Sequence, residues 1–159
     1  MKEITLTQGK VALVDDADYD WLNQFNWYAS RSRDTDNFYA MREDTTGKVV
    51  LMHCEILGLK GVDHRNGNGL DNRTFNLRPA TKTQNNWNRG AYKNNKSGFK
   101  GVYWIEGREK WLMAIQANKK RIHGGYFNTD IEAAAAYNYL AKKLHGEFAF
   151  LNDLSGVTI

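Results

Sequence analysis

Near the middle of the chain lies the segment VDHRNGNGLDNRTFNLR, residues 62–78, which decides how the first half folds. It joins the pair Asp63 and His64 to a loop rich in Gly and Asn. Asn76 stands twelve residues after His64, and Asn85 stands twenty-one residues after it. Few apolar residues occur here, so the segment is a poor place for a hydrophobic core and a good place for polar chemistry.

The side chains of this segment have complementary chemistry. Asp63 offers a carboxylate oxygen and Asn85 an amide oxygen, the hard donors that bind divalent cations, while His64 can take a proton near neutral pH. Thr81 is followed three residues later by Gln84, a capping-box pattern, so a helix is predicted to begin near Lys82 and to hold Asn85 in its first turns. The spacing predicts a cation held beside a general base.

This spacing resembles the ββα-metal motif of HNH nucleases, in the variant whose third signature residue is Asn. The resemblance implies that His64 ends a strand and acts as the general base. It implies that Asn76 orients the His64 ring through a side-chain amide hydrogen bond. It also implies that Asp63 and Asn85 are the ligands of Mg²⁺ or Mn²⁺.

Two other interpretations of the segment stay open. Asn-Gly, Asp and Asn are ordinary turn formers, so a surface turn without chemistry is one alternative. A zinc site is the other, but the single cysteine, Cys54, excludes a paired-thiolate zinc cage.

The amino-acid composition limits the classes to which this protein can belong. The 159 residues suffice for one medium domain or two small ones, and 42% apolar with 13% aromatic residues excludes wholesale disorder. The sequence has neither a run of eighteen apolar residues nor an apolar secretory leader, so no membrane association is expected. One cysteine fits a reducing compartment, and we expect Cys54 to be buried and the protein to be cytoplasmic, in a bacterial or phage-infected cell.

Charge is distributed unevenly along the chain. Residues 1–48 carry six Lys/Arg against nine Asp/Glu, whereas residues 88–123 carry nine Lys/Arg against two Glu. The second region therefore has a net charge of +7 and is predicted to face a polyanion, with a merely solvated basic face as the alternative.

The first 48 residues are predicted to form a small mixed α/β element in which we expect no chemistry, that is, no catalytic or ligand-binding residue. Apolar alternation around Gln8-Gly9 indicates a hairpin, residues 16–25 a short helix, and residues 27–29 and 38–41 two strands. The nuclease module then spans residues 49–88. It opens with an apolar segment in which His53 is interpreted as structural, with a direct catalytic role as the alternative.

Residues 89–97 form a basic linker rich in Asn, Lys and Gly, whose Arg89, Lys93 and Lys96 are placed to follow a phosphate backbone. Residues 98–152 then predict three strands, near 99–104, 110–117 and 121–127, and a helix from Asp130 that stops at Gly146. Thr129 and Glu132 form a second capping box. Residues 153–159 are interpreted as a tail.

The segments SGFKGVYW, KWLMAI, RIHGGYF, EAAAAY and FLN resemble the AP2 DNA-binding domain across nearly all of residues 97–152. The resemblance implies a three-stranded antiparallel sheet, packed on one helix, that enters the DNA major groove. The residues expected to contact DNA in this half are Lys100, Tyr103, Arg108, Lys110, Trp111, Gln116, Lys119, Arg121 and His123. Tyr103, Ile105, Gln116 and His123 depart from the plant pattern, so the base preference does not transfer.

The sequence therefore predicts an α+β protein in which an HNH module cuts duplex DNA and an AP2-like module positions it. The resemblance implies a phage or intron-homing type of endonuclease, monomeric on DNA. A DNA-binding regulator with a vestigial nuclease half is the main alternative, and RNA binding through the linker and exposed aromatics is a further one.

Overall fold

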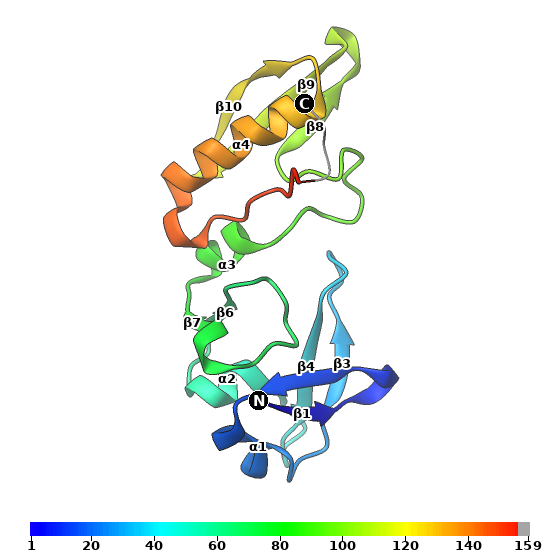
Figure 1. The fold of residues 1–159 in the computed structure, drawn as a ribbon, viewed down its shortest axis with the longest axis vertical. Coiled ribbons are helices and arrows are strands. Elements are labelled where there is room, and N and C mark those ends of the chain that lie inside the picture. Colours follow the sequence, from blue (N-terminus) through cyan, green and yellow to red (C-terminus); the bar gives the residue numbers. More distant parts are fainter. Residues whose placement is uncertain (156–159) are drawn as a thin grey trace. The chain divides into compact units, whose positions relative to one another are not determined.

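The structure is a computed structural model whose description covers residues 1–155. The chain divides into two compact units, Met1–Asn86 and Trp87–Ile159 (Figure 1). Each unit combines helices with small antiparallel sheets, so the predicted α+β class is confirmed. Within residues 1–155, no helix has the length and apolar character needed to cross a membrane. Of the predicted tail, residues 156–159 lie outside the described part.

Unit 1 begins with the predicted hairpin, in which β1 (Lys2–Thr5) pairs antiparallel with β2 (Val11–Val14). Helix α1 (Asp16–Leu22) follows, and then an antiparallel sheet in the order β3 (Tyr28–Arg31), β4 (Phe38–Glu43), β5 (Val49–Leu51). The apolar segment after residue 48 thus divides into strand β5 and helix α2 (Met52–Leu57). Cys54 of α2 is half-buried, not buried as predicted.

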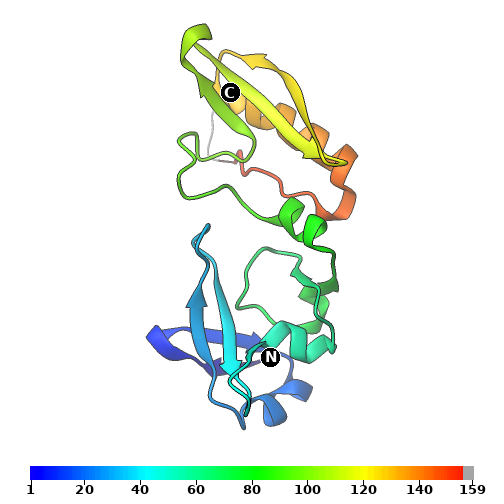
Figure 2. The same cartoon turned by 180° about the vertical axis from the view of Figure 1, so that it is seen from behind.

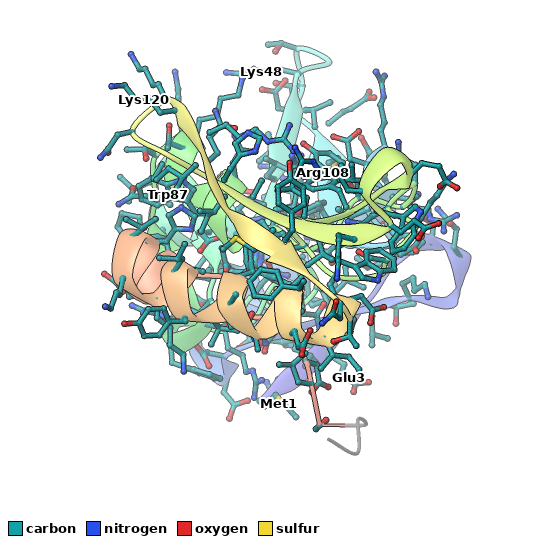
Figure 3. The ribbon with its side chains drawn as sticks, turned by 90° about the horizontal axis from the view of Figure 1, so that it is seen from above. Met1, Glu3, Lys48, Trp87, Arg108 and Lys120 are labelled. Atoms are coloured by element: carbon teal, nitrogen blue, oxygen red, sulfur yellow. The ribbon has the colours of Figure 1, made fainter. Side chains whose placement is uncertain are left out.

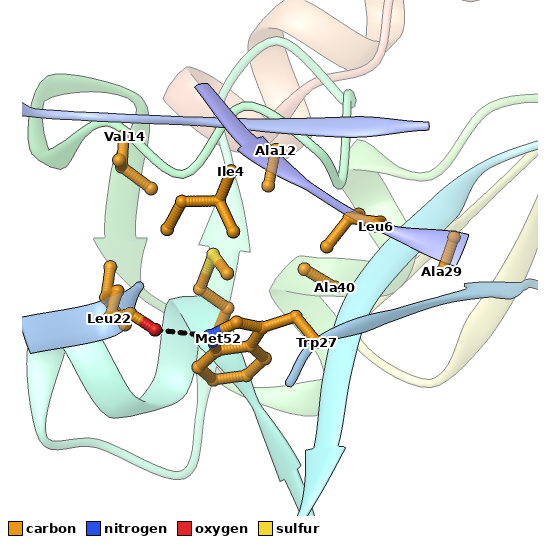
Figure 4. Packing of buried hydrophobic residues seen from close by; sticks show 9 residues of the cluster. All are labelled: Ile4, Leu6, Ala12, Val14, Leu22, Trp27, Ala29, Ala40 and Met52. Carbon is orange, nitrogen blue, oxygen red and sulfur yellow. Dashed lines mark hydrogen bonds between the residues drawn. The ribbon is translucent and has the colours of Figure 1, made fainter. Parts of the chain in front are cut away.

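One hydrophobic core holds unit 1 together (Figure 4). Its buried members are Ile4, Leu6, Ala12, Val14, Leu22, Trp27, Ala29, Ala40 and Met52. The Trp27 indole satisfies its N–H by donating to the Leu22 carbonyl at 2.8 Å. Because Met52 lies in the same core as the residues before position 48, the predicted boundary at residue 48 lies inside unit 1. Fully burying a side chain such as Met52 stabilises the fold by about 1.5–3 kcal/mol.

The segment that carries the predicted site forms two short antiparallel strands followed by a helix. Strand β6 (Val62–His64) pairs with β7 (Leu77–Pro79), and a loop ending in a 3-10 turn at Thr74–Asn76 joins them. Helix α3 (Lys82–Asn88) begins where predicted. Its capping box is formed: the Thr81 amide donates to Gln84 Oε1 at 2.8 Å and the Gln84 amide donates to Thr81 Oγ1 at 3.3 Å.

Unit 2 contains the predicted three strands and long helix. The sheet has the order β10 (Lys120–Phe127), β9 (Lys110–Ala117), β8 (Val102–Ile105), and α4 (Asp130–His145) lies behind it in Figure 2. Asn118 and Lys119 both have positive φ, the geometry of a two-residue hairpin turn. The capping box of Thr129 and Glu132 starts α4, and Gly146 caps its end.

Helix α4 packs closely on the sheet because small side chains face it. Ala133, Ala134 and Ala141 are fully buried against Val102, Met113 and Ile115. Gly101 lies at φ +78°, and a Cβ there would lie 2.7 Å from the Ala114 carbonyl oxygen and closer still to the Tyr137 ring. Glycine therefore suits this position on two counts, its backbone conformation and its space.

Candidate active site

His64, at the end of β6, lies in a buried polar pocket of unit 1. Its ring is 5% exposed, and Nε2 lies 3.1 Å from Asn72 Oδ1. The Asn72 amide nitrogen donates to the Leu70 carbonyl at 3.3 Å, which turns Oδ1 toward the histidine. An amide oxygen can only accept, so Nε2 carries the hydrogen and Nδ1 is the proton-accepting nitrogen. Burial lowers the pKa of His64, while Asn72 and the carboxylates of Asp63 and Asp71 act to raise it. The ring is therefore neutral at neutral pH, as a general base requires.

Asp63, the predicted metal ligand next to His64, is ion-paired. Strands β6 and β7 place it opposite Arg78, and the guanidinium donates to Oδ2 from Nε at 2.8 Å and from Nη2 at 2.7 Å. Both side chains are buried, at 7% and 4% exposure. Sequence reasoning did not foresee this partner, because only the strand register brings residues 63 and 78 together.

Asn85, the second predicted ligand, is tied to the same strand. Its amide nitrogen donates to the Val62 carbonyl at 3.1 Å, one residue before Asp63. That hydrogen bond involves only the amide nitrogen of Asn85. The amide oxygen, which is the atom that would bind a cation, does not take part in it. One carboxylate and one amide oxygen are hard donors that suit Mg²⁺. In the part of the chain described, no three His, Cys, Asp or Glu side chains gather to hold a metal, so a cation here would rely on water and phosphate oxygens as well.

Asn76 has a different role from the one predicted. The side-chain amide that meets the His64 ring is that of Asn72, whose Oδ1 accepts from Nε2, and Asn76 braces the loop instead. Its Oδ1 accepts from the Asn66 amide at 3.0 Å, and its Nδ2 donates to Asn66 Oδ1 at 3.0 Å and to the Asp71 carbonyl at 2.7 Å. The sequence does not distinguish the two asparagines, because both lie in the same Asn-rich loop and only its folded path decides which one meets the ring.

The loop that follows His64 is also held from outside the predicted nuclease module. Asn37, before β4, donates to the Gly67 carbonyl at 2.7 Å and accepts from the Gly69 amide at 3.0 Å. Leu13 of β2 exchanges backbone hydrogen bonds with Leu70 and Asn72, each 2.8 Å long. The residues before position 48, for which the sequence predicted no chemistry, therefore shape the loop beside His64.

Two further rings flank His64. His53 of α2 lies edge-to-face against it, with ring centroids 4.6 Å apart, and Tyr39 of β4 lies 5.9 Å from His53 and 6.0 Å from His64. His53 is therefore part of the site, although its apolar sequence context favoured a purely structural histidine.

In unit 2, the strand register places five of the predicted DNA contacts on one face. We call the sheet surface away from α4 the outer face; its exposed or half-buried side chains include Tyr103, Lys110, Gln116, Arg121, His123 and Tyr126. The guanidinium of Arg121 lies over the Tyr103 ring at 4.9 Å, and that of Arg108 lies over the Tyr126 ring at 4.7 Å. Figure 3 shows Arg108 beyond the strands, on the side away from α4. Lys119 is exposed at the β9–β10 turn.

Two of the predicted DNA contacts are corrected. Trp111 is paired with Phe127 and packs against the core under α4, edge-to-face with Trp104 at 5.2 Å, so it lies on the opposite side of the sheet. Lys100 is occupied by the backbone: its Nζ donates to the Trp87 and Arg89 carbonyls, both at 2.6 Å. It holds residues 87–89 in place within unit 2 instead of facing a phosphate.

The other basic residues of the predicted linker keep accessible positions. Lys93 and Lys96 are exposed, and the guanidinium of Arg89 lies over the Tyr92 ring at 4.3 Å. They remain predicted DNA contacts.

No protein-family model matches this chain. It is similar to an uncharacterised HNH endonuclease of Acanthamoeba polyphaga mimivirus, with 32% identity over 154 residues that cover 92% of this chain and 77% of the viral protein. It is also similar to protein 3.8 of Escherichia phage T7, with 36% identity over 89 residues that cover 55% of this chain and 72% of the phage protein. The chain belongs to the HNH endonuclease family. HNH nucleases are generally dependent on a divalent metal.

Proposed function

We propose that this protein is a metal-dependent DNA endonuclease in which unit 1 cuts and unit 2 binds duplex DNA. The observation that carries the proposal is the arrangement of side chains around His64. A neutral, buried imidazole has its Nε2 occupied by Asn72, Asp63 precedes it on β6, and Asn85 of α3 is hydrogen-bonded to Val62 of the same strand. The mimivirus relative, named as an HNH endonuclease, supports DNA as the substrate.

In the proposed reaction, His64 Nδ1 takes a proton from a water molecule, and the water oxygen attacks the scissile phosphorus. A new P–O bond forms while the bond to the 3′ oxygen breaks, which leaves a 5′-phosphate and, after proton uptake from solvent, a 3′-hydroxyl. Asn72 keeps the ring in the tautomer that can accept at Nδ1. Mg²⁺ or Mn²⁺, held by Asp63 and Asn85, would supply positive charge at the phosphate and the leaving oxygen.

The outer face of unit 2 is proposed as the DNA-binding surface. It presents Arg121 and Lys110 together with the hydrogen-bonding groups of Gln116 and His123, and Arg108 lies over the Tyr126 ring of the same face. A β-ribbon fits the DNA major groove, where base edges are distinguishable. Three antiparallel strands with one helix on the other face support the AP2-like interpretation, and with it a phage or homing type of enzyme that acts as a monomer.

Plasmid cleavage tests the proposal. Incubation with Mg²⁺ should nick or linearise the plasmid, and EDTA should abolish the activity because the cation is removed. The same samples should bind DNA with and without EDTA if unit 2 binds independently of the metal. Binding without cleavage in any divalent cation would instead identify the protein as a DNA-binding regulator. Binding to RNA alone would overturn the assignment of duplex DNA.

A further inference from the structure

His53 is a buried histidine that the mechanism above does not use. The residue is 5% exposed, and its buried Nδ1 has no hydrogen-bond partner within residues 1–155. A buried polar atom left unpaired destabilises a fold. Together with its contact to the candidate general base, this makes His53 a candidate for a functional role.

The arrangement around His53 points to the His64 ring. The two rings meet edge-to-face, with centroids 4.6 Å apart and planes at 74°. Tyr39 completes a cluster of three rings, and the Gly69 backbone is pressed against it: a Cβ at Gly69 would lie 2.6 Å from the Tyr39 ring atoms. The loop after His64 thus packs on Tyr39, and helix α2 supplies His53, so both border the cluster of rings.

We propose that His53 is a positioning residue, whose ring holds the His64 imidazole in the orientation in which Nε2 meets Asn72 and Nδ1 is presented to the attacking water. The inference rests on the proposed function of His64. Edge-to-face packing from His53 restricts how the His64 ring can turn, and reacting groups held in the correct geometry react faster.

The ring of His53 suits a packing role because it stays uncharged. Burial, and after it the neighbouring His64, lower the pKa of His53 to about 3. Over the pH range in which a nuclease works, His53 therefore adds no positive charge beside a group that must itself accept a proton. It acts through its shape.

The test compares three variants of the full chain, His53→Ala, His53→Phe and His64→Ala, under single-turnover conditions at saturating DNA. His53→Ala should lower the maximal cleavage rate roughly 10–100-fold, as a misplaced catalytic group does. The Kd for DNA should stay unchanged, because the outer face of unit 2 is untouched. His53→Phe keeps a ring at this position and should recover most of the rate.

A spectroscopic measurement separates positioning from general loss of structure. The protein has four histidines, so the ring-proton NMR signals of His64 are identified by their loss in His64→Ala. They should shift in His53→Ala, where the neighbouring ring is gone, and stay close to wild type in His53→Phe. If His53→Ala does not fold, seen as lost signal dispersion in its NMR spectrum, His53→Leu replaces it: it fills the space without an aromatic plane and should show the same rate loss.

The outcomes distinguish the inference from the function on which it rests. A wild-type rate in a folded His53→Ala or His53→Leu variant would overturn the inference while leaving His64 as the base. An equal loss in His53→Ala and His53→Phe would also overturn it, because a ring nitrogen and not ring packing would then be needed. Undiminished cutting by His64→Ala would reject the proposed function itself.

Discussion

Arg78 donates two hydrogen bonds, from Nε and Nη2, to the same carboxylate oxygen of Asp63, and both side chains are buried. The residue proposed to bind the cation is therefore already half of an ion pair. Removing one partner of a buried pair leaves an uncompensated charge, whereas removing both avoids that cost.

Substitutions of Asp63 and Arg78 should separate an effect on stability from an effect on activity. Asp63→Asn should lower the free energy of unfolding by about 3 kcal/mol, because Arg78 loses its counter-charge. The double variant Asp63→Asn with Arg78→Met should regain much of that stability and remain inactive, since the metal ligand is still missing. Urea unfolding and plasmid cleavage measure the two effects. Recovery of cleavage in the double variant would show that Asp63 serves stability alone.

His64→Ala should cut DNA at least ~10²-fold more slowly than wild type, because a general base typically contributes about 10²–10⁴-fold. DNA affinity should be unchanged. Asn72→Ala should give a smaller loss, since the ring remains but its tautomer is no longer fixed. Rates at saturating DNA, with Kd measured by anisotropy, check both variants. A loss of affinity that parallels the loss of rate would contradict the assignment.

The buried histidines predict a pH-dependent stability. The unfolded chain protonates His53 below about pH 6.5, whereas the folded chain resists protonation of this residue down to its pKa of about 3. The free energy of unfolding should therefore fall as the pH drops through this window, by about 1.4 kcal/mol per unit for one such group. Burial lowers the pKa of His64 as well, so it acts in the same direction. Urea unfolding at about pH 7.5 and about pH 5 measures the slope. His53→Phe should make it shallower, and an unchanged slope would show that His53 does not contribute.

The outer face of unit 2 predicts which charges govern salt dependence. Arg121→Ala should flatten the slope of log Kd against log salt concentration by about one if the guanidinium meets a phosphate. Lys142→Ala removes the same charge from an exposed position on α4 and is the matched control, expected to leave the slope unchanged. Titrations at about 50 and about 200 mM salt compare them. Equal effects of the two variants would mean that net charge, and not the outer face, drives binding.

Lys100→Ala is expected to behave differently from Arg121→Ala. Its ammonium group is held by the Trp87 and Arg89 carbonyls, so its loss should lower the melting temperature of unit 2 and leave the salt slope nearly unchanged. Thermal unfolding of the full chain checks the first effect. A flattened slope at full stability would restore Lys100 as a phosphate contact.

Local signals in the sequence were sufficient to predict elements of the fold. Both capping boxes depend on neighbouring residues alone, and so does the turn of Asn118 and Lys119 between two of the predicted strands. Such patterns place a helix start or a hairpin without knowledge of the rest of the chain.

Features that depend on register or on distant contacts were not predictable. Trp111 lies in a strand whose Leu112 to Ile115 are all buried, so no alternation of polar and apolar residues marks its faces. Lys100 is basic like its neighbours, and only the path of the chain brings two carbonyls to its Nζ. Asn72 and Asn76 differ only in where the loop turns.

The loop after His64 is anchored by Asn37, Leu13 and Asp15. This anchoring has a consequence for the order in which the chain folds during its synthesis. All three lie ahead of the loop in the chain: Asp15 Oδ2 accepts from the Thr74 amide at 2.8 Å, and Asn37 and Leu13 hold Gly67 to Asn72. Because the ribosome makes the N-terminal part first, these anchors have left it before the loop emerges. This loop can dock onto waiting partners as it is translated, so that the proposed nuclease site of unit 1 can form before unit 2 is made.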